Sequence, residues 1–137
     1  ATGATWLFVL SPRLSTTTCW RRIQTMEAQG VILGRVALLD RSALGLDVTI
    51  FAHVKLSTQG RDAIAAFAEA IRERPEVLDC YTTMGEWDFM LRIVTKDIKA
   101  YEAFYLDHLS KLPYVQSINS SVTVTVIKET TVLPIID

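Results

Sequence analysis

Apolar residues recur at every second position through VTIFAHVKL, the segment from Val48 to Leu56. Side chains of a strand point alternately to its two faces, so this pattern predicts a β-strand with one face against a core. The apolar face would carry Val48, Ile50, Ala52, Val54 and Leu56. The opposite face would carry Thr49, Phe51, His53 and Lys55.

Two later segments repeat apolar residues at the spacing of a helix. The first spans residues 61–74 and is closed by Pro75, and the second opens at Thr95-Lys96-Asp97 and ends before Pro113. Their expected inner stripes are Ile64, Phe67, Ala68 and Ile71 in the first, and Ile98, Tyr101, Tyr105 and Leu109 in the second. Each segment therefore predicts an amphipathic helix that buries one face.

Three further strands complete the pattern. Val77–Met84 and Trp87–Val94 are separated by Gly85-Glu86, which is the spacing of a hairpin with a two-residue turn. Trp87, Phe89, Leu91 and Ile93 would share the apolar face of the second strand of this hairpin. The last strand, Val115–Ile127, contains SVTVTVI. The order β-α-β-β-α-β predicts an α+β, ferredoxin-like sandwich: a four-stranded antiparallel sheet with both helices on one face.

The sheet face without helices would have a mixed character. It would carry Phe51, His53, Lys55, Met90, Arg92, Thr123 and Thr125. This set is too apolar for a fully solvated face and too polar for the core of a monomer. We therefore expect the face to be half-buried in a homo-oligomer.

A helix with a basic face is predicted ahead of this domain. Ser15 is a candidate N-cap and Gly30 a left-handed stop, and 31–40 predicts a strand before a turn at 41–45. Hydroxyl groups at the start of a helix, followed by two arginines, suit contacts to phosphates and base edges in a DNA major groove. The residues concerned are Thr16, Thr17, Thr18, Arg21 and Arg22. The same spacing also fits an amphipathic helix with a solvated basic face.

Composition narrows the class of protein. Half of the 137 residues are hydrophobic and 21% are charged, which allows a core and argues against disorder. The net charge of −1 gives no global basic excess, so DNA affinity would need a local patch. Cys19 and Cys80 are too few for a disulfide scaffold and indicate free thiols in a reducing compartment. No apolar run reaches the roughly 18 residues that span a bilayer, and no signal peptide is evident. We expect a cytoplasmic protein that does not enter a membrane.

No residue pattern indicates catalysis. His53 and His108 lack a His, Cys or carboxylate at ligand spacing, so His53 is better explained as an interface side chain and His108 as a solvated one. Cys80 has no neighbouring His to activate it, which favours an inert thiol. There is no Gly-rich phosphate loop and no Gly-x-Ser-x-Gly elbow. We predict no enzyme, no metal and no cofactor; a small ferredoxin-like enzyme, such as an acyl phosphatase or a cofactor-free oxygenase, is the weaker alternative.

The hairpin tip, Met84-Gly85-Glu86-Trp87-Asp88, is the candidate site for a small effector. An amino acid needs an anion for its ammonium, donors for its carboxylate and a wall for its side chain. Asp88 can supply the first, backbone N–H groups near Gly85 the second, and Trp87 or Met84 the third. From the last strand, Gln116 and Ser120 are candidates to complete the pocket from the other side. The alternative is that Asp88 only caps the hairpin and Trp87 belongs to the core.

Several segments, in order, resemble the Lrp/AsnC family of bacterial and archaeal regulators, also called feast/famine proteins. STTTCWRRI and EAQGVI resemble the end of that family's recognition helix and the following wing. LLDRSALGLDVTIFAHVKL resembles its linker strand and the first strand of its ligand-responsive domain. PEVLDCYTTMGEWDFMLRIV matches a pattern of Pro-x-Val, Tyr and Gly-x-x-Asp, and LPYVQSINSSVTVTVIKETTVLPI resembles the closing strand. The resemblance implies the same fold, dimers that commonly associate to octamers, and amino-acid binding near the Gly-x-x-Asp loop between dimers.

The resemblance divides the chain into three parts. Residues 1–32 would be a remnant of a helix-turn-helix DNA-binding domain, 33–45 a linker strand and connector, and 46–137 the ligand-responsive and oligomerisation domain. The family has two helices ahead of the recognition helix, and ATGATWLFVLSPRL lacks their pattern, so we expect an incomplete helix-turn-helix. The leading hypothesis is a transcriptional regulator of Lrp/AsnC type that senses an amino acid. The alternative is a stand-alone, effector-sensing oligomer without DNA binding.

Overall fold

The computed structural model describes residues 15–136. The expectation that 1–14 lack the pattern of two DNA-binding helices falls outside this range. The chain divides into two compact units, and each is described by itself. One, the sheet unit, is Leu39–Ile127; the other, the helix unit, is formed by Ala1–Leu38 and Lys128–Asp137. The expected boundaries after residues 32 and 45 stay predictions.

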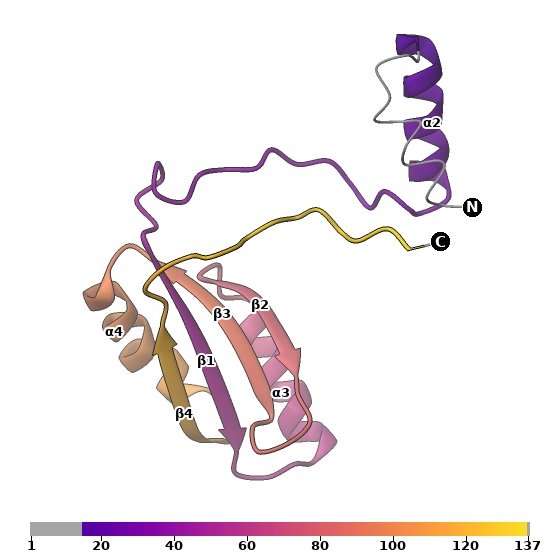
Figure 1. The fold of residues 1–137 in the computed structure, drawn as a ribbon. Coiled ribbons are helices and arrows are strands. Elements are labelled where there is room, and N and C mark those ends of the chain that lie inside the picture. Colours follow the sequence, from indigo (N-terminus) through magenta and orange to yellow (C-terminus); the bar gives the residue numbers. More distant parts are fainter. Residues whose placement is uncertain (1–14, 137) are drawn as a thin grey trace. The chain divides into compact units, whose positions relative to one another are not determined.

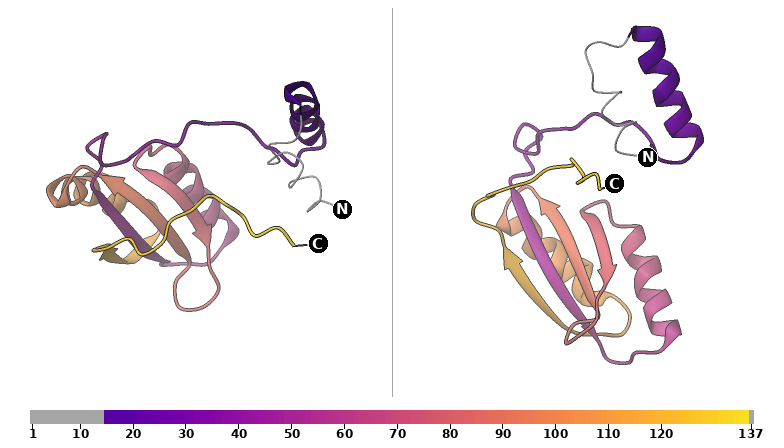
Figure 2. Two further views of the ribbon diagram at one scale, coloured as in Figure 1. Left: turned by 45° about the horizontal axis from the view of Figure 1, so that its top comes forward. Right: turned by 45° about the vertical axis from the view of Figure 1, so that its right-hand side comes forward.

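Four antiparallel strands form the sheet (Figure 1): β1 Val48–Leu56, β2 Val77–Thr82, β3 Phe89–Thr95 and β4 Val115–Val122. Their order across the sheet is β2-β3-β1-β4. The helices α3 (Arg61–Arg72) and α4 (Ile98–Asp107) cover one face, and a short 3-10 helix, η1 (Leu109–Lys111), follows α4. Figure 2 shows both helices of this unit on the same side of the sheet. The predicted ferredoxin-like fold is confirmed.

The core lies between the sheet and the two helices. Ile50, Ala52 and Val54 of β1 are fully buried, as are Leu91 and Ile93 of β3. Burying a valine, leucine or isoleucine side chain stabilises the fold by about 1.5–3 kcal/mol. The alternation predicted for the two central strands is confirmed, because their inward residues form this core.

The helix stripes differ in part from those expected. In α3, Ala63 is buried with Phe67 and Ile71, whereas Ile64 is 36% exposed. In α4, Phe104 is buried, whereas Ile98 is 53% exposed. Placing the two isoleucines in the core was wrong, because the stripe is centred on the helix line nearest the sheet and not on the largest apolar residues.

The last strand is shorter than its alternating sequence. Val122 pairs with Ile50, and the N–H of Thr123 donates to the carbonyl of Thr49 at 3.0 Å. The partner strand β1 begins at Val48, so residues 125–127 have no strand to pair with, and Val124, already past the end of β4, is 97% exposed. The predicted extension to Ile127 was wrong because an alternating sequence forms a ladder only where a partner backbone lies beside it.

The segment expected to be a linker strand also forms no strand. The helix α2 spans Thr16–Ala28, with Ser15 as its N-cap and Gly30 at φ 78° as its left-handed stop, as predicted. Residues 33–40 then carry no strand, and a turn over 41–45 leads to β1. Leu33 is 97% exposed. Within residues 15–136, the backbone of this segment pairs with no strand.

Candidate functional site

The tip between β2 and β3 is a six-residue loop, residues 83–88, and not the two-residue turn that the sequence suggested. The N–H of Thr83 donates to the carbonyl of Asp88 at 3.0 Å, and its hydroxyl donates to the carbonyl of Trp87 at 2.7 Å. The first of these bonds carries the pairing one residue past Thr82 and Phe89 and closes the base of the loop. Gly85 has φ 118°, a conformation that L side chains rarely adopt. The loop therefore has a defined shape that depends on glycine.

Asp88 anchors this loop to the neighbouring strand. Its carboxylate oxygen Oδ2 accepts a hydrogen bond from the N–H of Leu56 at 2.7 Å, and its own N–H donates to the carbonyl of Val54 at 2.9 Å. Both partners lie at the end of β1, 32 or more positions earlier in the chain. Asp88 is half-buried and holds the end of β1, whereas the alternative from the sequence was a cap on the hairpin itself.

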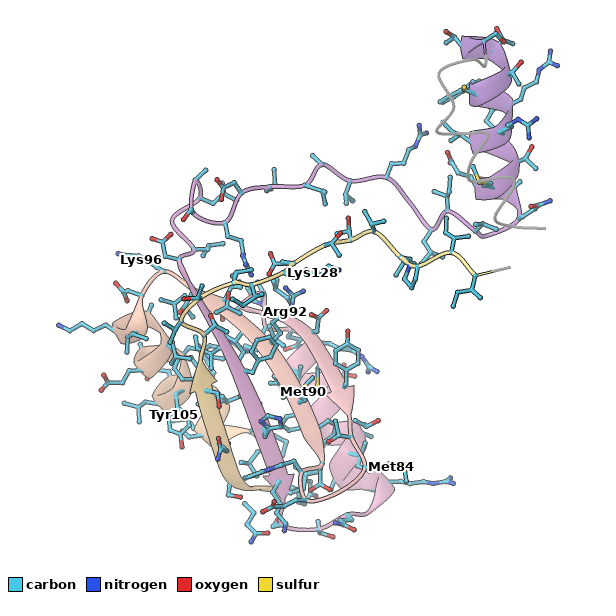
Figure 3. The ribbon with its side chains drawn as sticks, in the orientation of Figure 1. Met84, Met90, Arg92, Lys96, Tyr105 and Lys128 are labelled. Carbon is cyan, nitrogen blue, oxygen red and sulfur yellow. The ribbon has the colours of Figure 1, made fainter. Side chains whose placement is uncertain are left out.

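The other loop residues differ in exposure. Met84 is fully exposed, at 102%, and Figure 3 shows it at the tip. Glu86 is exposed and Trp87 is half-buried. The Trp87 ring lies 6.0 Å from that of His53, which faces away from the helices. The expectation that Trp87 shares the face of Phe89 was wrong, because Trp87 belongs to the loop and not to β3.

Gln116 and Ser120 lie on β4, which β1 separates from β3 and its loop. Ser120 stands opposite Ala52, and its hydroxyl hydrogen-bonds with that of Tyr101. Burial raises the pKa of the Tyr101 hydroxyl above its ordinary value of 10.0, although the bond to Ser120 opposes this shift. Within one chain, the structure does not bring these two candidates together with residues 84–88.

The uncovered sheet face is the mixed surface that the alternation predicted. Figure 3 shows Met90 and Arg92 on the side of the sheet away from the helices. Arg92 Nε lies 2.5 Å from Asp79 Oδ2, and both side chains are about one third exposed. Asp79 and Tyr81 of β2, opposite Arg92 and Met90, were missed. Alternation within β2 could have placed them on this face, but the register shifts between Val77 and Asp79, so the face of each residue cannot be counted from the start of the strand. Thr125, expected here, lies beyond β4.

The candidate DNA-contact residues all lie on the first half of α2. Thr16, Thr17 and Arg21 are exposed, and Thr18 and Arg22 are half-buried. The Ser15 hydroxyl accepts from the Thr18 N–H at 3.2 Å and donates to the Thr18 hydroxyl at 2.8 Å. Thr18 is thus part of the helix cap, which leaves Thr16, Thr17 and Arg21 as the freely presented members of the set.

The other residues with reactive side chains, His108 and Cys80, are half-buried. His108, expected to be solvated, is half-buried, with Nε2 3.4 Å from Arg74 Nη1 and its ring 5.8 Å from that of Phe104. Burial raises the pKa of the Cys80 thiol above its ordinary value of 9.0, with Arg72 opposing the shift, which supports an unreactive thiol. Over residues 15–136, no three His, Cys, Asp or Glu side chains are grouped as metal ligands. In the same range, no helix has both the length and the apolar character to cross a membrane.

Residues 49–133 match the family model of the Lrp/AsnC ligand binding domain. The chain is 36% identical to the DNA-binding transcriptional activator DecR of Escherichia coli, over 89% of this chain and 80% of that protein. It is 34% identical to the transcriptional regulator AzlB of Bacillus subtilis, over 89% of this chain and 78% of that protein.

Solved structures give the same similarity. A transcriptional regulator from Neisseria meningitidis, determined as a complex with L-Met, superposes with a TM-score of 0.82 at 36% identity, covering 88% of this chain and 78% of that one. An AsnC family regulator from Agrobacterium tumefaciens gives a TM-score of 0.81 at 42% identity, with the same coverage. The similarity to these structures covers 88% of the chain, so it includes residues outside the sheet unit as well as the ferredoxin-like sheet unit itself.

Proposed function

The chain belongs to the Lrp/AsnC family of transcriptional regulators, and we propose that its sheet unit binds an amino acid at the loop 83–88 and couples that binding to self-association. The observation that carries this proposal is the anchoring of Asp88. One carboxylate oxygen is held by the backbone of β1, so the second oxygen has a fixed position at the loop. A fixed anion next to exposed groups is a preorganised receptor for an ammonium.

The rest of the loop suits the other parts of an amino acid. The N–H groups around Gly85 provide donors for a carboxylate, and the exposed Met84 with Trp87 provides an apolar wall. The N. meningitidis relative, a complex with L-Met, supports an amino acid as the ligand class. Gln116 and Ser120 would come from a neighbouring copy, because β1 separates them from the loop within one chain.

Calorimetry with each of the twenty amino acids tests the effector proposal. Asp88→Asn is the informative variant, because its amide oxygen can still accept from Leu56 while the charge is lost. We expect the wild type to bind at least one amino acid. Asp88→Asn should weaken this binding about tenfold or more, because one charge-assisted hydrogen bond is lost. Glu102→Gln, an exposed carboxylate on α4, is the matched control. Binding that Asp88→Asn leaves unchanged would place the site elsewhere.

Self-association is proposed through the uncovered sheet face, as a dimer that assembles further to an octamer. Phe51 and Met90 there are half-buried within one chain, beside the Arg92–Asp79 ion pair. Phe51→Asp would place a charge without a partner in this interface and should shift light scattering towards monomer. Ile98→Asp, on the helix side, is the matched control and should leave the mass unchanged. A monomeric wild type at micromolar concentration contradicts the proposal.

DNA binding is proposed through α2, where Arg21 and Arg22 follow three threonines. A gel-shift series over increasing salt measures it, because each phosphate contact steepens the loss of affinity with salt. Replacing both arginines with alanine should lower affinity and flatten that slope. Effector binding would act by linkage: a ligand that prefers one assembly state shifts the population towards it and so changes DNA affinity. Salt-independent or absent DNA binding favours the second candidate, a stand-alone effector-sensing oligomer.

A further inference from the structure

A cavity of about 330 Å³ lies at the end of the sheet opposite the loop 83–88. Strand β3 runs from the loop, at Phe89, to the cavity, at Thr95, and Figure 3 shows Met84 and Lys96 at these two ends. Its walls come from the turn before β1, the chain before β2, the end of β3 and one face of α4. All four segments belong to the sheet unit, so the cavity is complete within one chain.

The cavity has an apolar floor. Val94 and Phe104, each 5% exposed, form it, with Leu46 at the side. Small-molecule sites generally have volumes of about 300–1,000 Å³ and a mostly apolar lining with a few polar groups. At 330 Å³ this cavity lies at the lower end of that range, which suits a small ligand with a short apolar body.

The polar atoms around this floor are mainly acceptors. Glu76 and Asp107 contribute carboxylates. Thr95 is 5% exposed, and its hydroxyl donates to the carbonyl of Asp97 at 3.0 Å, so towards a ligand its oxygen can only accept. A buried hydroxyl with its hydrogen already engaged, beside two carboxylates, selects for a ligand that donates.

The charges in the lining favour a cation. Two carboxylates face one ammonium, that of Lys96, which is exposed at the rim. His108 also lines the cavity, and its Nε2 lies 3.4 Å from Arg74 Nη1. Among the side chains that line the cavity, the two carboxylates therefore outnumber the one ammonium.

We propose that this cavity binds a small primary amine with a short apolar body. The three N–H groups of its ammonium would donate to the oxygens of Glu76, Asp107 and Thr95, and its body would cover Val94 and Phe104. This inference does not rest on the effector site at the loop. An amine without a carboxylate has nothing to offer the N–H groups around Gly85, so the two sites select different ligands.

Titration of the ¹⁵N-labelled protein with 3-methylbutylamine, followed by amide chemical shifts, tests the proposal. We expect saturable shifts at residues 94–108, and none from 4-methylpentanoate, which has the same apolar body with an anionic group. Asp107→Asn should weaken the amine about tenfold. Ala103→Phe should abolish binding, because Ala103 lines the cavity yet is exposed, so a larger side chain fills the cavity without entering the core.

Two controls separate this site from general effects. Glu102→Gln removes an exposed carboxylate from the same helix outside the lining, and Asp88→Asn alters the loop; both should leave amine affinity unchanged. The proposal is overturned if the carboxylic acid binds as tightly as the amine, if Glu102→Gln weakens binding as much as Asp107→Asn, or if the shifts centre on 83–88. A thermal melt of each variant verifies that it is folded. If Ala103→Phe is not folded, the effect of Asp107→Asn on amine affinity decides whether the proposal holds.

Discussion

Replacing Asp88 with alanine should destabilise the sheet unit even in the absence of any effector. The carboxylate holds the N–H of Leu56, a residue only 3% exposed, at 2.7 Å. Alanine would leave that buried N–H without its acceptor, and an unsatisfied buried donor costs about 1–3 kcal/mol. Asparagine keeps an acceptor oxygen and loses only the charge, which should cost about 1 kcal/mol. For a domain of this size, each kcal/mol lowers the melting temperature by roughly 4–8 °C.

Thermal unfolding followed by circular dichroism measures this effect. The variants are compared at one protein concentration, because self-association itself raises the melting temperature. Glu86→Ala is the matched control: Glu86 is an exposed carboxylate of the same loop, and its removal should change the free energy of unfolding by less than about 0.5 kcal/mol. If Asp88→Ala melts with the wild type, the bond to Leu56 contributes nothing and the loop is not anchored as described.

Three further outcomes follow from the packing and the ionisable groups. Phe67→Ala should cost about 3–5 kcal/mol in urea unfolding, because Phe67 is fully buried and stacks on Phe89 at 4.3 Å; a smaller loss would mean that the core collapses to fill the space. The pKa values of Cys80 and Tyr101 are raised, so the folded state favours their neutral forms, and this contribution to stability is complete below about pH 9 and is lost as the pH rises further. Urea titrations should therefore show a free energy of unfolding that declines above the ordinary pKa values of 9.0 and 10.0, and Tyr101→Phe should flatten this decline. Arg35→Ala should speed amide exchange in α2 slightly, since Arg35 pairs with Glu27 at 3.3 Å and lies 5.2 Å over the Trp20 ring, exposed contacts worth under about 1 kcal/mol each.

The faces of the central strands could be predicted from sequence because a strand has a fixed period of two. Ile50 and Leu91 lie inside, and Phe51 and Arg92 outside, as their alternation requires. Where strands end could not be predicted in this way. The residues after Val122 alternate more regularly than those of β4 itself, but β1 begins at Val48, only two positions before the partner of Val122, so residues 125–127 have no strand to pair with. A strand ends where its partner strand no longer lies beside it, and the pattern of one segment contains no information on where the partner lies.

The loop could not be predicted for a related reason. Gly85-Glu86 has the spacing of a tight turn, but the strands end at Thr82 and begin again at Phe89, and the bond from Thr83 to Asp88 closes a six-residue loop between them. The bond from Leu56 to Asp88 joins positions 32 apart, and no local pattern contains it. Trp87 consequently leaves the face of Phe89 and lies beside His53 on the opposite side of the sheet. The residues of the candidate site were found by their chemistry, whereas their directions depended on contacts with a distant strand.

These long-range contacts change how the candidate effector site must be tested. Asp88 and Ser120 were singled out as polar residues for a ligand, yet each already holds part of the fold, through Leu56 and Tyr101 respectively. A carboxylate has two oxygens, so Asp88 can cap β1 with one and face a ligand with the other. Alanine at either position would confound lost binding with lost structure. The variants that separate the two roles keep the structural bond: Asp88→Asn retains an acceptor for Leu56, and Ser120→Thr retains a hydroxyl for Tyr101. If Asp88→Asn is still folded at the assay temperature, as its melting temperature shows, and yet binds the ligand more weakly, the charge of Asp88 itself contributes to effector binding.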